Sequence, residues 1–218
     1  MTSGAICDNT SAHSFTKMYQ SHRIKDGRYG AYLPFTISDS MGLEGGNEGM
    51  QRQDLTKSLK GFIKDGYMLD KDESCSEKDA GFNHSPTLDD QIHCLVSIIP
   101  ATSAKMIDQD IFEKMRHVRC KATEMKIPQV ALLTKVDNCS EEVKKDIQSV
   151  YKSKKIKAQM EVCSNRLGVP MNFIFPVKNY HEEIDLDNDI DVLLLSALTR
   201  ILNIANDHVD QLPQDTHT

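Results

Sequence analysis

The sequence lacks several features that would assign it to a familiar class of protein. No apolar run among its 218 residues reaches the roughly 18 residues that a membrane-spanning helix needs, since Arg200 interrupts the nearest candidate, residues 192–205. The start of the chain has no basic residues and no long apolar core, so we expect no secretory signal. The six cysteines include no C-x-x-C pair, which favours reduced thiols in the cytoplasm over disulfides.

The chain also lacks an excess of positive charge. Lys and Arg total 26 against 32 for Asp and Glu, giving a formal charge of −6, which argues against a nucleic-acid partner. Hydrophobic residues make up 39% and charged residues 27%, the composition of a soluble globular protein. We expect a flexible N-terminus at 1–14, one domain at 15–206 and a polar tail at 207–218.

Apolar segments that read as strands alternate with segments of helical period. Residues 31–38, 92–99, 128–133 and 171–177 are the expected strands, and 92–99 has the continuous apolar character of a strand buried on both faces. Residues 54–63, 103–125, 140–166 and 187–206 are the expected helices, with Ser103 capping the second. This order predicts an α/β sandwich with a mostly parallel sheet. Ligands of such sheets bind at the carboxyl ends of the strands, where we expect every motif below.

The most specific short motif is Thr134-Lys135-Val136-Asp137, directly after an expected strand. An aspartate here can accept two charge-assisted hydrogen bonds from the guanine edge, which adenine cannot supply. Lys135 would lie along the base and Thr134 would bracket the loop. The same four residues would also arise if a lysine and an aspartate simply solvated a strand end, so the motif alone leaves both interpretations open.

A second motif, Asp39-Ser40-Met41-Gly42, follows the expected strand at 31–38. In nucleotide switches such an aspartate holds Mg²⁺, usually through water, and the glycine N–H approaches the terminal phosphate. An aspartate-initiated turn with glycine at its fourth position is the common alternative.

The remaining expected parts of a nucleotide site are weak or missing. Val177 and Lys178 follow the last strand, where the Val177 N–H would meet the guanine carbonyl and Lys178 would flank the ring. The glycine-rich residues 42–49 lack the terminal Lys-Ser/Thr of a phosphate loop, so a switch-like loop is the better interpretation. No G-x-x-x-x-G-K-[ST] occurs anywhere in the sequence.

The sequence does not support a zinc site, a catalytic nucleophile or a calcium loop. The histidines are dispersed, without a zinc-binding spacing, and no arrangement suggests a serine or cysteine nucleophile. Alternating aspartates near the start of the last helix resemble a calcium loop, but Ile190 stands where that loop needs glycine. Acidic residues in the first turn of a helix explain them better, because they complement its dipole.

Taken together, the segments resemble the interferon-induced protein 44 and 44-like family. The carrying segments are Ile24-Lys25-Asp26-Gly27, Leu33-Pro34-Phe35, Ser38-Asp39-Ser40-Met41-Gly42-Leu43, Ile92-His93-Cys94, Val130-Ala131-Leu132-Leu133-Thr134-Lys135-Val136-Asp137 and Asp191-Val192-Leu193-Leu194-Leu195-Ser196-Ala197-Leu198. The resemblance implies a P-loop-NTPase-like, G-domain-like three-layer fold, cytoplasmic residence and a part in the interferon-induced antiviral response. It also implies that the phosphate-loop region is missing here, so that the fold is incomplete at its N-terminus.

Two functions follow from the resemblance. The first is a GTP- or GDP-binding domain with Mg²⁺, working as a switch or at most as a weak GTPase, since Leu43 stands where efficient GTPases place a water-orienting glutamine. The second is a non-catalytic, G-like module that acts through protein partners. Without a phosphate loop the polyphosphate loses several charge-assisted hydrogen bonds, at about 1.5–3 kcal/mol each, so we expect weak GTP binding at best and favour a chain that is not an enzyme.

Overall fold

The structure is a computed structural model that describes residues 17–27, 30–43, 50–70 and 72–212. The chain divides into two compact units, Met1–Gln91 and Ile92–Thr218. Each unit is described by itself below. The prediction of a single domain over residues 15–206 stays a prediction.

Unit 1 contains an antiparallel pair of strands, β1 (Gln20–Lys25) and β2 (Tyr32–Asp39), with Gln20 opposite Asp39 and Lys25 opposite Tyr32. A helix, α1 (Arg52–Leu59), and a 3₁₀ turn, η1 (Leu88–Asp90), follow. Strand β2 alternates between half-buried and exposed residues over most of its length, as a strand with one solvated face does. The core of this unit gathers mostly from its loops and comprises Tyr19, Met41, Met50, Ile63, Leu69, Cys75 and Phe82.

Unit 2 is built on a parallel three-stranded sheet in the order β3-β4-β5. The strands are β3 (Leu95–Pro100), β4 (Gln129–Thr134) and β5 (Ile174–Pro176). Pro100 lies opposite Thr134, and Leu133 lies opposite Pro176, so the three strands end at the same edge of the sheet. Parallel strands of this kind need crossover connections, which the helices of the unit supply.

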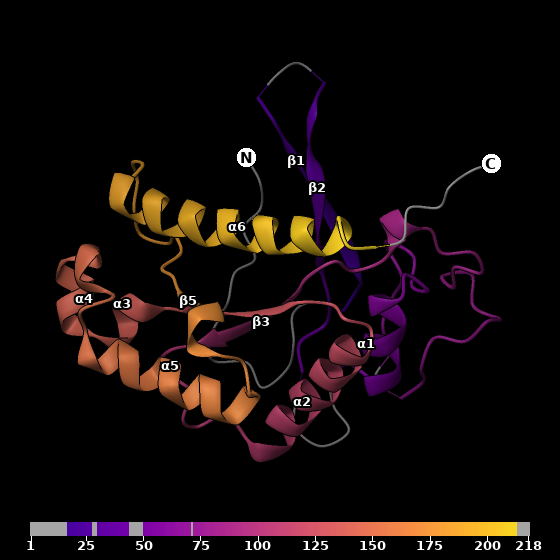
Figure 1. Cartoon of the computed structure of the whole chain (residues 1–218), viewed down its shortest axis with the longest axis horizontal. Coiled ribbons are helices and arrows are strands. Elements are labelled where there is room, and N and C mark those ends of the chain that lie inside the picture. The colour runs from indigo at the N-terminus through magenta and orange to yellow at the C-terminus, as the bar shows by residue number, and fades with distance from the viewer. Residues whose placement is uncertain (1–16, 28–29, 44–49, 71, 213–218) are drawn as a thin grey trace. The chain divides into compact units, whose positions relative to one another are not determined.

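Helices cover both faces of this sheet. Figure 1 shows α6 (Asn188–Val209) on one side and α2 (Gln109–Glu124) and α5 (Lys154–Leu167) on the other. The core under α2 and α5 joins all three strands, through Ile99, Leu133 and Ile174, to Phe112 and Ile156. An α/β fold with a parallel sheet is thereby confirmed for unit 2.

Local sequence explains where these helices begin and end. In α5 the buried residues Ile156, Met160, Cys163 and Leu167 recur at helical spacing. Gly168 ends the helix in the left-handed conformation, φ 77°, which a glycine adopts without steric cost. Helix α6 begins after Asp187, whose carboxylate accepts the N–H groups of Asp189 and Ile190.

Two predicted helix boundaries are wrong. The helix expected from Ser103 begins at Gln109, because the Ser103 carbonyl closes a turn by accepting the N–H groups of Met106 and Ile107. A short helix, α3 (Val136–Cys139), precedes the helix expected over 140–166, which is broken into α4 (Glu141–Lys145), a 3₁₀ turn η2 (Ile147–Ser149) and α5. Asp146 accepts the Gln148 N–H there, offering the backbone an alternative to a continuous helix.

The remaining differences concern the ends of the chain and one strand. Another short turn, η3 (Met171–Phe173), takes up the first half of the expected last strand. Helix α6 continues to Val209, three residues into the expected tail. Residues 1–14, predicted to be a flexible N-terminus, and most of the glycine-rich residues 42–49 lie outside the described residues. None of the helices in the described ranges is long and apolar enough to cross a membrane.

Candidate functional site

The predicted guanine-reading loop lies at the carboxyl edge of the unit 2 sheet. Thr134 ends β4, its hydroxyl lies 3.5 Å from the Ile99 carbonyl oxygen, and its own carbonyl accepts the Ala101 N–H at 2.7 Å. Lys135 then adopts the left-handed conformation, with φ 56° and ψ 39°. A non-glycine residue held there is strained, and such residues cluster at functional sites. The turn at Lys135 directs the chain into α3, which carries Asp137.

Asp137 is buried, with 6% of its surface exposed. Among the described residues, none donates a hydrogen bond to its carboxylate. Burying an ionised carboxylate without donors is costly, so buried carboxylates are normally hydrogen-bonded or paired. The two carboxylate oxygens of Asp137 thus lie at the sheet edge, and no described residue donates a hydrogen bond to them.

Lys178, the predicted ring-flanking residue, lies close enough to Asp137 for the two charges to interact. Its ammonium group donates to Glu183 Oε1, and both side chains are largely buried. Burial by itself lowers the pKa of Lys178, but the hydrogen bond and charge of Glu183, with the charges of Asp137 and Asp187, raise it above its usual value. Sequence reasoning gave no role to Glu183.

Glu183 is held in turn by the backbone of its own loop. Its Oε2 accepts the N–H groups of His181, at 3.0 Å, and Glu182, at 3.3 Å. The bond from Lys178 and the bond from the His181 N–H lower the pKa of Glu183 to about 2. Glu183 therefore stays ionised through the physiological range and keeps Lys178 in place.

The role predicted for Val177 needs correction. Its N–H donates to the Leu133 carbonyl at 2.8 Å, extending the ladder between β5 and β4. The group is therefore already used and cannot also meet a guanine carbonyl in this conformation. A donor from this loop would have to come from a neighbouring residue, and the sequence alone could not reveal this because the bond joins two distant strands.

The predicted switch residues belong to unit 1. Asp39 is the last residue of β2 and is exposed. The expectation that every motif ends a strand of one parallel sheet is wrong for Asp39, because β2 pairs antiparallel with β1. Gly42 is also exposed, and its carbonyl accepts the Met50 N–H at 3.4 Å.

The structure gives the predicted magnesium ion no visible ligand set. In the described ranges, no group of three or more His, Cys, Asp or Glu side chains could hold a metal ion. The assignment of Mg²⁺ to Asp39 stays a prediction, as does the approach of Gly42 to a phosphate. Binding of a base at the sheet edge of unit 2 stays a prediction as well.

The chemistry of the site is that of recognition. Asp137 offers two acceptor oxygens, and Lys135 and Lys178 offer long cationic side chains beside them. The nearby thiols are poor nucleophiles, because burial raises the pKa of Cys139 and raises that of Cys163 to about 11. Recognition of a planar donor such as guanine by these side chains stays a prediction.

Comparisons with known proteins give relatives of one family over nearly the whole chain. Human interferon-induced protein 44 is 33% identical over 204 residues, covering 94% of this chain and 46% of that protein. The human 44-like protein is 33% identical over 201 residues, covering 92% of this chain and 44% of that protein. Mouse interferon-induced protein 44 is 33% identical over 195 residues, 89% of this chain and 46% of its own length. No family model matches the chain, and no solved structure matches it significantly.

The fold and the site define an α/β protein with a candidate base-reading loop at the edge of a parallel sheet. The similarity, which extends over nearly the whole chain, shows that this α/β protein belongs to the interferon-induced protein 44 and 44-like family, as a partial match. The chain spans somewhat less than half the length of the curated relatives it matches.

Proposed function

We propose that this chain is an interferon-induced protein of the antiviral response that carries a guanine-reading loop and binds GTP only weakly. The observation that carries the guanine part is the Asp137 carboxylate, which is buried at the sheet edge and receives no hydrogen bond from the described residues. The names of the relatives support the interferon part.

Guanine suits this carboxylate because its N1–H and its exocyclic amino group present two parallel donors to one acceptor pair. Charge-assisted bonds of this kind are worth about 1.5–3 kcal/mol each. Adenine presents an acceptor at N1 beside its amino group, so it can donate only one hydrogen bond to Asp137 and turns the N1 lone pair towards the second carboxylate oxygen. Lys178, held beside Asp137 by Glu183, would lie along the ring.

The triphosphate is the weak part of the proposed complex. The 218 residues contain no G-x-x-x-x-G-K-[ST], the loop whose backbone N–H groups and lysine normally hold the β- and γ-phosphates. Losing several such bonds weakens binding by orders of magnitude, since each 1.4 kcal/mol is tenfold in affinity. Base recognition and nucleotide affinity are therefore separate questions for this chain.

Base recognition can be tested without phosphates. Guanosine and adenosine are titrated to millimolar concentration into ¹⁵N-labelled protein, and the shifts of the backbone N–H signals of Asp137 and Lys178 are followed. We expect guanosine to move both signals and adenosine to move neither. Asp137→Asn should abolish the response to guanosine, and equal responses to both nucleosides would refute a guanine-reading role.

Weak nucleotide binding has its own test. A fluorescent GTP analogue is titrated with Mg²⁺ into the wild type and into Asp137→Asn. We expect neither protein to bind at micromolar concentration, so the substitution should hardly change the curve. Micromolar or tighter, magnesium-dependent binding that Asp137→Asn abolishes would overturn the proposed weakness.

The proposed place in the interferon response is tested in cells that carry the gene. Transcript abundance should rise after treatment with type I interferon, and deletion of the gene should raise the yield of an infecting virus. An unchanged transcript abundance would mean that interferon does not induce this gene, in contrast to what the names of its relatives state.

A non-catalytic module that acts through protein partners is the second candidate. The absence of a phosphate-loop motif from the sequence favours it. It predicts normal antiviral activity for Asp137→Asn, whereas a nucleotide-dependent function predicts loss of activity for the same variant.

A further inference from the structure

The loop between β5 and α6 exposes two large apolar side chains. Ile184 is 99% exposed and Leu186 is 85% exposed. Side chains so exposed contribute nothing to the core of unit 2. Leaving them in water forgoes about 1.5–3 kcal/mol per residue relative to full burial. The fold around them therefore gives no reason for their apolar character.

This loop is nevertheless held in one shape. The Tyr180 hydroxyl donates to Asp191 Oδ1 at 2.8 Å and accepts the Asp187 N–H at 2.8 Å, and it also lies 2.9 Å from the Asp187 carbonyl oxygen. The pair of Lys178 and Glu183 fixes the other side of the loop. Ile184 and Leu186 thus project from a braced loop, and apolar side chains fixed in advance lose less conformational entropy on binding.

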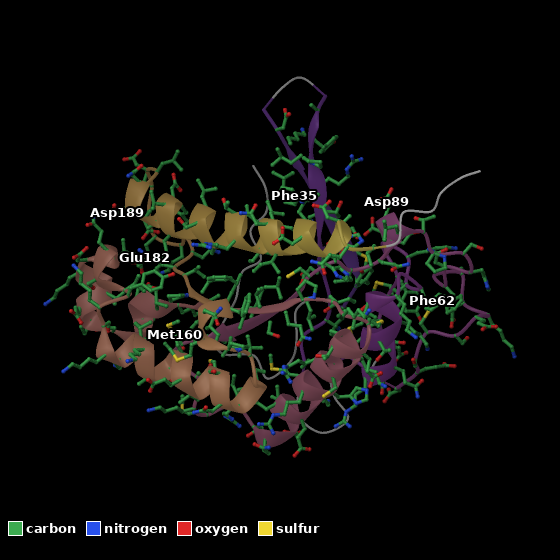
Figure 2. The ribbon with its side chains drawn as sticks, in the orientation of Figure 1. Phe35, Phe62, Asp89, Met160, Glu182 and Asp189 are labelled. Atoms are coloured by element: carbon green, nitrogen blue, oxygen red, sulfur yellow. The ribbon has the colours of Figure 1, made fainter. Side chains whose placement is uncertain are left out.

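The surroundings of the two apolar side chains are strongly acidic. Glu182 lies two residues before Ile184 and Asp185 follows it, and both acidic side chains are exposed. Asp189 lies in the first turn of α6, and Figure 2 labels Glu182 and Asp189 at the same end of unit 2. From residue 179 to residue 199 the chain contains six carboxylates and no Lys or Arg. His181 Nε2 lies 3.4 Å from Glu182 Oε1 and is charged only when protonated. We call Glu182, Ile184, Asp185 and Leu186 the acidic tip.

We propose that the acidic tip is a docking surface for a partner protein that presents an apolar pocket rimmed by lysine or arginine. Ile184 and Leu186 would enter the pocket, and Glu182 and Asp185 would pair with its rim. Apolar anchors inside a polar rim are the usual anatomy of a protein interface. Charge complementarity selects this occupant, because complementary potentials steer the right partner and repel wrong ones.

The same charges disfavour the other occupants of an apolar tip. A second copy would bring two acidic tips together, and like charges in contact cost several kcal/mol. The cytoplasmic face of a membrane is itself negative and attracts basic segments rather than acidic ones. The proposal does not depend on nucleotide binding, and the guanosine titration would leave it unaffected.

The test uses a defined probe in place of an unknown partner. A fluorescein-labelled amphipathic peptide of leucine and lysine is titrated into the full chain and followed by fluorescence anisotropy, beside a counterpart with glutamate at every lysine position. We expect the lysine peptide to bind and the glutamate peptide not to bind. Ile184→Ser with Leu186→Ser should weaken binding at least tenfold, whereas Met106→Ser, at a residue 73% exposed elsewhere in unit 2, should not.

A matched pair of charge variants separates the acidic tip from the general acidity of the chain. Glu182→Gln with Asp185→Asn should weaken binding of the lysine peptide severalfold. Asp72→Asn with Glu73→Gln, at exposed acids of unit 1, should leave it unchanged. Tyr180→Phe, which releases the brace and leaves the acidic tip intact, should weaken binding by a smaller factor.

Several outcomes would overturn the proposal. Equal loss from both charge pairs would mean that the peptide binds by net charge alone. Unchanged binding by Ile184→Ser with Leu186→Ser would mean that these two side chains do not contact the peptide. Binding of the wild type to zwitterionic vesicles, or dimerisation that the serine variant abolishes, would assign the acidic tip to a membrane or to a second copy. Failure of an Ile184→Cys thiol to react with maleimide in a Cys120→Ser background would show that the chain itself covers the acidic tip.

Discussion

Among the residues that the structure describes, each unit has one buried aspartate, and the hydrogen bonds of the two differ. Asp54 of α1 in unit 1 is 0% exposed, and Asp137 of α3 in unit 2 is 6% exposed. Asp54 Oδ1 accepts the Ser74 hydroxyl and the Cys75 N–H, and the Lys57 ammonium lies 3.6 Å away. Asp137 receives no such bond from any described residue.

The difference marks Asp54 as a structural carboxylate and leaves the oxygens of Asp137 without a hydrogen bond from the described residues. Asp54 joins the loop at 74–75 to α1, and Lys57 strengthens the junction by donating to the Ser74 hydroxyl and the Cys75 carbonyl. Asp54 Oδ2 is buried and has no partner among the described residues, so even this network is only half satisfied. Burial alone therefore does not reveal a functional aspartate, whereas the source of its hydrogen bonds does.

The largest expected effect falls on Asp54. Asp54→Ala removes the acceptor for the Ser74 hydroxyl and the Cys75 N–H and leaves both inside unit 1. Breaking a buried charged network of this kind costs about 3 kcal/mol. Urea denaturation should show that loss in the free energy of unfolding. A loss below about 1 kcal/mol would mean that Asp54 is not the structural residue that its contacts indicate.

Lys57 should matter less than Asp54, because its side chain is partly exposed. Lys57→Met keeps the aliphatic stem and removes the bonds to Ser74 and Cys75, so we expect a loss of about 1–2 kcal/mol. Lys60→Met, at the exposed end of the same helix, is the matched control and should change stability by less than about 0.5 kcal/mol. Equal losses of stability from Lys57→Met and Lys60→Met would mean that the bonds of Lys57 to Ser74 and Cys75 do not stabilise unit 1.

The Glu183 pair in unit 2 predicts an acid-sensitive contribution to stability. The pKa of Glu183 falls from an ordinary 4.5 to about 2 on folding, so its stabilisation is fully present above pH 4.5 and is lost as the pH falls from there towards 2. Glu183→Gln should flatten the pH dependence of unfolding over this interval. Glu182→Gln, at the exposed neighbouring residue, should leave the same profile unchanged, and identical profiles for wild type and Glu183→Gln would contradict the pairing.

The smallest effect on stability is expected at Asp137. Asp137→Asn keeps the shape of the side chain and removes a charge that receives no hydrogen bond from the described residues and interacts only with the nearby charge of Lys178. Stability should therefore change by less than about 0.5 kcal/mol. Urea denaturation of this variant beside Asp54→Asn makes the comparison direct. A loss of more than about 1 kcal/mol at Asp137 would make it structural and would weaken the guanine proposal.

Much of unit 2 could be predicted from the sequence. The apolar run at 128–133 predicted β4 to within one residue at each end, and the run at 92–99 predicted β3, which begins three residues later, at Leu95. Unit 1 was harder, because its core gathers from loops that have no periodic pattern. The break between α4 and α5 was missed because Asp146 and Ser153 lie within an otherwise helical spacing.

By itself the sequence determined the alternation of strands and helices in unit 2 and the position of Thr134, Lys135 and Asp137 at a strand end. Such features follow from the direction of the side chains, which repeats every 2 residues in a strand and every 3.6 residues in a helix. They can therefore be recognised from neighbouring residues in the sequence. Only the tertiary structure decided that the Val177 N–H is used by Leu133, that Glu183 holds Lys178, and that Asp54 has donors where Asp137 has none. These depend on contacts between distant segments, because a buried polar group takes whichever partner the fold brings to it.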